Sequence, residues 1–158
     1  MLFEQEAVRL QTALAPWLLG GVEHIGSTAV PGLAAKPILD MLAPVADLND
    51  ARAAVPVLAD LGYMHGDHRP REALWFYGQE GEGFETRTHQ LHLTRPDSAL
   101  WRERVAFRDA LRADASLLDE YQALKKTLAA NGGDLTAYTA GKRAFVAGVL
   151  RSTGLSLG

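Results

Sequence analysis

The stretch that decides the fold lies at residues 22–42 and reads VEHIGSTAVPGLAAKPILDML. A short apolar segment ends at Gly26-Ser27, a loop of small residues follows, and a second apolar segment carries one acid, Asp40, in its middle. A connection that only joins two strands has little need for so many small and specialised residues. We therefore expect the rest of the chain to hold this loop and Asp40 in place.

The totals of the chain are typical of a soluble protein, with 47% hydrophobic and 22% charged residues. Its 158 residues predict a single domain, residues 1–158. Cysteine is absent, which excludes disulfides, thiolate zinc sites and cysteine nucleophiles. The formal charge of −3 provides no field to attract bulk nucleic acid. An acidic N-terminus and the lack of an apolar window of about 18 residues predict a cytoplasmic protein that does not enter a membrane.

Hydrophobic periodicity predicts a helix and then two strands at the start of the chain. Apolar residues recur at helical spacing from Phe3 to Leu14, and Pro16 ends this helix. Residues 22–25 are expected to form a first strand. Residues 37–45 are expected to form a second, buried on both faces because its apolar residues occupy both parities. Asp47 or Asn49 can cap the helix that follows.

That next helix should start late or kink at Pro56 and end at Gly62. Residues 73–77 and 86–94 are then expected to form an antiparallel hairpin around a glycine-rich turn. After Pro96 the pattern is helical, over segments 100–111, 117–128 and 134–149. The chain therefore predicts an α/β or α+β domain, with a mixed sheet of four to five strands, flanking helices and a helical C-terminal third.

Gly26-Ser27 is a candidate phosphate-binding turn. A strand that ends in Gly-Ser presents backbone N–H groups and a hydroxyl without a bulky side chain in the way. The alternative is an ordinary tight turn in which Ser27 caps a helix. The spacing matches neither a Walker loop nor a dinucleotide-binding fingerprint.

Asp40 is a candidate metal ligand, because an unpaired carboxylate on an apolar strand would be unfavourable. A divalent cation with phosphate oxygens would satisfy it, and so would a backbone group or an arginine. His92 could join it as a ligand. His89, three residues earlier on the same strand, should point to the opposite face.

Several further side chains are candidates for the same pocket. Lys142 lies on the apolar stripe of the last predicted helix, where it either reaches the helix edge or points inward to bind an anion. Arg87 supplies a cation beside the sheet, and His24 could line the pocket next to Gly26. His65 and His68 fall in a polar loop and are expected to be solvated.

One long motif resembles the signature of the GrpB family of nucleotidyltransferase-like proteins, namely residues 23–40, EHIGSTAVPGLAAKPILD. Shorter stretches resemble the same family in the same order: 87–92 (RTHQLH), 107–112 (FRDALR), 121–125 (YQALK) and 138–145 (YTAGKRAF). The resemblance implies a polymerase-β-like nucleotidyltransferase fold. In that superfamily a Gly-Ser turn holds the phosphates of a nucleotide, and acids on the next strands hold two Mg²⁺ or Mn²⁺ ions. Gly26, Ser27 and Asp40 match this plan.

The sequence departs from that plan at two positions. Leu42 stands where a second acid would complete an acid-x-acid pair, and the later strand offers His92 rather than a carboxylate. Glu23 is the nearest other acid on the first strand. Two hypotheses follow. One is metal-dependent nucleotidyl transfer, with Asp40 and Ser27 in catalysis and Lys36, His92 and Lys142 positioning the substrate. The other is a binding module for a nucleotide or another small phosphorylated molecule that does not turn it over.

Overall fold

The computed structural model describes residues 2–26, 29, 38–79, 87–130 and 135–152, and the rest of the chain is not discussed below. Six α-helices and five strands are present in this part of the chain. In chain order the elements are α1 (Leu2–Leu14), β1 (Glu23–Ile25), β2 (Leu39–Pro44), α2 (Leu48–Ala51), the 3₁₀ helix η2 (Arg52–Ala54), α3 (Val55–Asp60), β3 (Met64–Gly66), β4 (Ala73–Gln79), β5 (Arg87–Thr94), α4 (Ala99–Ala113), α5 (Ala115–Ala130) and α6 (Leu135–Ser152).

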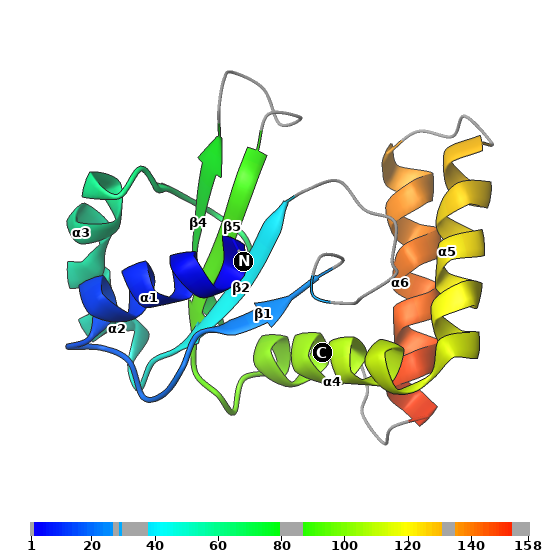
Figure 1. Ribbon diagram of the computed structural model, residues 1–158, viewed down its shortest axis with the longest axis horizontal. Helices are drawn as coiled ribbons and strands as arrows, with labels where there is room; N and C mark the ends of the chain where they lie inside the picture. The colour runs from blue at the N-terminus through cyan, green and yellow to red at the C-terminus, as the bar shows by residue number, and fades with distance from the viewer. Residues whose placement is uncertain (1, 27–28, 30–37, 80–86, 131–134, 153–158) are drawn as a thin grey trace.

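The strands form one mixed sheet in the order β1-β2-β5-β4-β3 (Figure 1). The pair β2–β5 is parallel, and the pairs β1–β2, β4–β5 and β3–β4 are antiparallel. Strand β2 is buried along nearly its whole length, as the apolar residues on both of its parities predicted. The expected mixed sheet with flanking helices and a helical C-terminal part is confirmed.

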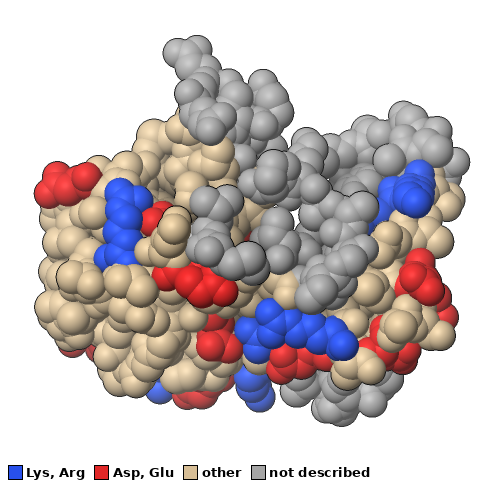
Figure 2. All heavy atoms as spheres, viewed as in Figure 1, with Lys and Arg blue, Asp and Glu red and all other residues tan. Residues whose placement is uncertain are grey.

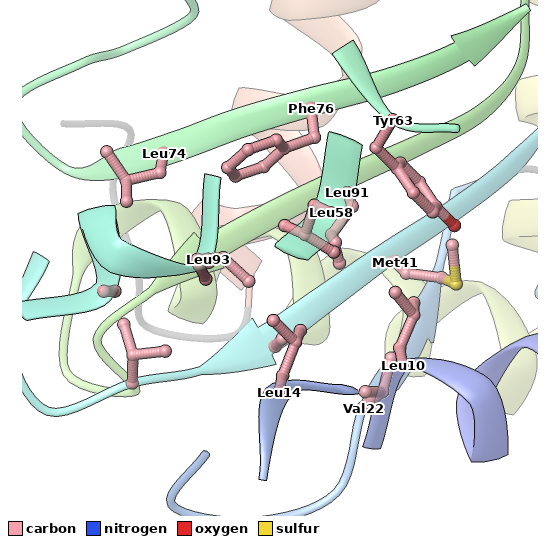
Figure 3. Packing of buried hydrophobic residues seen from close by; sticks show 14 of the residues in the cluster. Leu10, Leu14, Val22, Met41, Leu58, Tyr63, Leu74, Phe76, Leu91 and Leu93 are labelled. Carbon is pink, nitrogen blue, oxygen red and sulfur yellow. The ribbon is translucent and has the colours of Figure 1, made fainter. Parts of the chain in front are cut away.

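One face of the sheet packs against the N-terminal helices. Leu10 and Leu14 of α1 and Leu58 of α3 meet Met41 of β2 and Phe76 of β4 in a fully buried cluster (Figure 3). Burying each such side chain contributes roughly 1.5–3 kcal/mol, so this layer supplies much of the stability that fixes the sheet.

The segment around Pro56 is interrupted, as its sequence predicted. Helix α2 begins after Asp47, whose side chain accepts hydrogen bonds from the backbone N–H groups of Asn49 and Asp50. A 3₁₀ turn follows, and α3 then begins with Pro56 in its first turn. Proline is compatible with that position because the first N–H groups of a helix have no intrahelical acceptor.

The other face of the sheet meets α4. Ile25, Leu42, Ala73 and Leu100 form a second buried cluster there. Ser98 caps α4 by accepting a hydrogen bond from the N–H of Trp101. Helices α5 and α6 pack side by side and against α4, away from the N-terminal helices (Figure 1). Helix α4 therefore connects the sheet to the C-terminal helices.

None of the helices in the described ranges is both long and apolar enough to cross a membrane. Acidic and basic side chains are interspersed over the face shown in Figure 2.

Candidate anion-binding site

Gly26 lies directly against the side chain of Asp40. Strands β1 and β2 are antiparallel with Ile25 opposite Asp40, so the residue that follows β1 comes next to the carboxylate. A Cβ at position 26 would lie 2.9 Å from the Cβ of Asp40 and 3.0 Å from its Cγ, and closer still to Oδ2. Gly26 also has a φ of 74°, in the left-handed region that favours glycine. Both its conformation and its neighbour therefore require glycine here.

Asp40 is partly buried on the face of the sheet that α4 covers. Burial raises the pKa of its carboxyl to about 6, although the positive charges of Arg104 and Lys142 act to lower it. Strand β2 lies inside the sheet between β1 and β5, so Asp40 does not stand at a sheet edge. The described charged residues that act on Asp40 are Arg104 of α4 and Lys142 of α6. The fold therefore brings together residues that are far apart in the sequence.

Two cations and one carboxylate of the described residues act on Lys142. Burial lowers the pKa of its ammonium group, and the positive charges of Lys125 and Arg104 lower it further. Asp40 raises that pKa, but by less than either cation lowers it. Burial also lowers the pKa of Arg104. An anion bound here would be attracted by the positive charges of Arg104, Lys125 and Lys142.

His92 faces the same side of the sheet as Asp40. It pairs with Leu42 of β2, which is two residues from Asp40, and residues two apart on a strand share a face. Its Nε2 lies 3.0 Å from Nδ1 of His68. Burial, together with the positive charges of Arg104 and other neighbours, lowers the pKa of His92 to about 2. His92 is therefore neutral at any ordinary pH and acts in a hydrogen bond rather than as a charge.

The positions of His89 and His68 agree with those expected from the sequence. His89 lies on the opposite face, as expected, and its Nε2 is 3.5 Å from Oε2 of Glu6. His68 is exposed, as expected for a polar loop, but its contact with His92 was not predictable from the sequence pattern. Arg69, in the left-handed region with a φ of 50°, follows His68 in this loop.

The described donors around Asp40 do not fit a divalent metal. Among the described residues no group of three or more His, Cys, Asp or Glu side chains is placed to hold an ion. Nε2 of His92, predicted as a ligand beside Asp40, is already occupied by His68. The described charges that act on Asp40 are those of Arg104 and Lys142, and both are positive. They disfavour the binding of a metal cation there.

Two arginines of α4 hold β1 and the turn that follows it. Nη1 of Arg108 donates to Oε1 of Glu23 at 3.1 Å and to the carbonyl oxygen of His24 at 3.0 Å. Nε of Arg112 donates to the carbonyl oxygen of Ala29 at 2.9 Å. With Arg104 these residues recur every four positions, so they share one face of the helix. This four-residue spacing is the sequence signal by which the three arginines could have been recognised as one group, and it was not used to predict them.

The structure places the other predicted residues as follows. The prediction that His24 lines the pocket is not met, because His24 pairs with Met41 rather than Asp40 and stacks on Phe3 at 4.5 Å, on the opposite face. Glu23 lies on the face of Asp40, where it forms an ion pair with Arg108. Three of the predicted site residues are not placed in this way: Ser27 and Lys36 lie outside the described residues, as does the side chain of Arg87.

Comparison with known proteins identifies the family. The family model described as GrpB protein matches residues 1–152. The chain belongs to the GrpB family. Curated GrpB relatives include UPF0157 protein BH1888 of Halalkalibacterium halodurans, 41% identical over 76% of this chain and 59% of the relative. The glutamate-rich protein GrpB of Alkalihalophilus pseudofirmus is 33% identical over 94% of this chain and 87% of the relative.

A solved GrpB structure has the same fold. The crystal structure of the conserved protein GrpB from Enterococcus faecalis superposes with a TM-score of 0.80 and 31% identity, over 98% of this chain and 93% of that chain. A structure of Cid1 with the UTP analogue UMPNPP gives a TM-score of 0.43 at 12% identity, a likeness too distant to carry an inference about this GrpB chain. The chain spans about six tenths of the length of two of the curated relatives, BH1888 and the UPF0157 protein PA4798 of Pseudomonas aeruginosa.

Proposed function

We propose that this GrpB-family chain binds a nucleotide or another small phosphorylated molecule, with the anionic group beside Asp40. The observation that carries the proposal is that Arg104 of α4 and Lys142 of α6 both lie near enough to Asp40 for their positive charges to lower the pKa of its carboxyl. Among the described residues, two cations, Lys125 and Arg104, and one carboxylate, Asp40, act on Lys142, and burial is the main cause of the lowered pKa of its ammonium group. Partly buried cations bind phosphate oxygens more strongly than solvated ones, since less water screens the interaction.

The turn after β1 supports this location. The missing side chain of Gly26 makes room for the side chain of Asp40, and the carbonyl of Gly26 accepts a hydrogen bond from the N–H of Ala29 at 3.1 Å. Backbone N–H groups in such a turn are suited to phosphate oxygens. We include Ser27 and Lys36 in the proposed phosphate site on their place in the family motif.

Metal-dependent nucleotidyl transfer, with Mg²⁺ or Mn²⁺ on Asp40 and His92, is the competing hypothesis from the sequence. The positive charges of Arg104 and Lys142 that act on Asp40, and the contact between His68 and His92, favour binding of a ligand without such an ion. The two hypotheses differ in a measurable way, because binding through cations needs no metal.

Isothermal titration calorimetry with ATP, in EDTA and again in Mg²⁺, tests the proposal. We expect binding in EDTA, and Arg104→Gln and Lys142→Gln should each weaken it roughly tenfold, the effect of losing one charge-assisted contact. Arg102→Gln and Arg143→Gln are matched controls, because both residues are exposed on the same two helices, and they should bind ATP like the parent chain.

Two results would contradict the proposal. Binding in EDTA that is unchanged in both Arg104→Gln and Lys142→Gln would place the anion elsewhere. Binding that requires Mg²⁺ and disappears in Asp40→Ala would instead favour the transfer hypothesis.

A further inference from the structure

Aligned residues form two rows across the sheet on the face of the proposed site. The first row runs through Asp40, Gln90 and Tyr77 on strands β2, β5 and β4, and the second through Leu42, His92 and Trp75. Neighbouring strands lie about 4.8 Å apart, so Tyr77 is roughly 10 Å from Asp40 along its row. Residues that are paired in register share a face, which places Tyr77 and Trp75 on the side of Asp40.

Trp75 and Tyr77 form an aromatic platform, a name used below for these two side chains. Their ring centroids are 5.0 Å apart with planes at 35°. Gly66 of β3 lies against both, since a Cβ there would be 2.7 Å from Cζ3 of Trp75 and 3.1 Å from Cε1 of Tyr77. The ring of His68 is 6.0 Å from that of Trp75. Both platform residues are partly buried, so they keep some surface.

The platform lies beyond the apolar cluster under α4. That cluster takes Ala73 from β4, together with Leu100 of the helix and apolar residues of β1 and β2. Trp75 and Tyr77 come two and four residues further along the same face of the strand. Aromatic rings placed beside a cationic site, rather than in the core, are typical of surfaces on which planar ligands stack.

We infer that the ligand carries an aromatic ring, as a nucleobase does, that stacks on the platform while its phosphates lie by Asp40, Arg104 and Lys142. This inference rests on the proposed function and narrows its ligand to a nucleotide. Gln90 lies between the two ends, where its amide can both donate and accept hydrogen bonds to a sugar or a base edge. The distance along the row is of the order of the distance between the base and the phosphates of a nucleotide.

Calorimetry in EDTA with two probes of similar charge, inorganic tripolyphosphate and ATP, separates the platform from the anion site. The full chain should bind ATP at least about tenfold more tightly than tripolyphosphate, because a stacked base adds to the phosphate contacts. In Trp75→Leu and Tyr77→Leu the affinity for ATP should fall to within about twofold of that for tripolyphosphate, by loss of the stacked base. Affinity for tripolyphosphate should not change in either variant.

Controls keep the test interpretable if a leucine variant folds poorly. Trp75→Phe keeps a ring and should retain most of the preference for ATP. Trp17→Leu is the matched control, because Trp17 packs against the core on the other face of the sheet. This variant should retain the full preference for ATP over tripolyphosphate. In a Trp17→Phe/Trp101→Phe chain, which keeps Trp75 alone, ATP should quench tryptophan fluorescence and tripolyphosphate should not.

The outcomes distinguish the two proposals. Equal affinity of the parent chain for ATP and tripolyphosphate, or Trp75→Leu weakening both probes alike, would overturn the platform and leave the anion site standing. Failure of both probes to bind would overturn both proposals.

Discussion

A Cβ on Gly26 would lie 2.9 Å from the Cβ of Asp40, so neither residue can gain bulk without displacing the other. The contact joins the end of β1 to the middle of β2 and fixes the start of the family loop against the acid of the next strand. The turn and the carboxylate thus form one structural unit.

The first prediction concerns this contact. Gly26→Ala should lower the free energy of unfolding by about 2–4 kcal/mol, because it combines a strained left-handed backbone with a collision. Gly62→Ala is the matched control: Gly62 has a φ of 95° but nothing within 4 Å of its added Cβ. The control should lose only the roughly 1–2 kcal/mol of backbone strain. Chemical denaturation measures both, and equal losses would show that the contact with Asp40 has no effect.

The second prediction concerns the pH dependence that Asp40 contributes. Its pKa is about 6 in the folded chain and 3.8 as the ordinary value, so between these pH values the folded chain retains a proton that the unfolded chain releases. Stability from this group therefore falls as the pH rises from about 4 to about 6. Asp40→Asn should be more stable than the parent at pH 7, on the order of 2–3 kcal/mol.

Denaturation of both chains from pH 4 to pH 8 gives the difference that isolates Asp40. The stabilisation by Asp40→Asn should grow as the pH rises through this window and become constant above it. A difference that does not vary with pH would contradict the raised pKa.

The third prediction concerns His92, which acts in the opposite direction. Its pKa is lowered to about 2 from 6.5, so below pH 6.5 the unfolded chain binds a proton that the folded chain does not. The stability contributed by the neutral His92 is present above pH 6.5 and is lost as the pH falls. His92→Gln should lose less stability than the parent between pH 6.5 and pH 5. In NMR spectra the ring signals of His92 should not shift between pH 5 and pH 8, and a titration near 6.5 would refute this.

The fourth prediction concerns the attachment of α4 to β1. Arg108→Gln should lower the free energy of unfolding by about 2–3 kcal/mol, since it leaves the carboxylate of Glu23 and the carbonyl of His24 without this donor. Arg102→Gln, at an exposed position of the same helix, should change it by less than about 0.5 kcal/mol. Thermal or chemical denaturation compares the two, and similar effects would show that Arg108 does not hold the strand.

The elements that depend on local pattern were predictable from the sequence. The two-parity apolar run of β2 indicated a buried strand, and Pro56 indicated the interruption between α2 and α3. The contact of Gly26 with Asp40 was not predicted, since the family motif only assigned both residues to one site. Hydrophobic period and turn chemistry act over a few residues, which is the range a single sequence reveals.

The errors arose where tertiary structure decides. His24 was placed by its nearness to Gly26, but β1 has three residues and is too short to show which parity faces the site. Arg104 was missed because a charged stripe on a helix usually faces solvent, and only the packing of α4 turns it inward. The contact of His68 with His92 depends on the fold of a loop, for which the sequence pattern holds no signal.

Both outer strands of the sheet, β1 and β3, have only three residues. An edge strand exposes unpaired backbone N–H and C=O groups that can recruit a strand from another molecule, and a short edge offers few of them. The longer strands β2, β4 and β5 lie inside the sheet, and each has a neighbouring strand on both sides over at least part of its length. The strand order thus limits edge-to-edge aggregation, because the outermost strands offer few backbone groups to another copy.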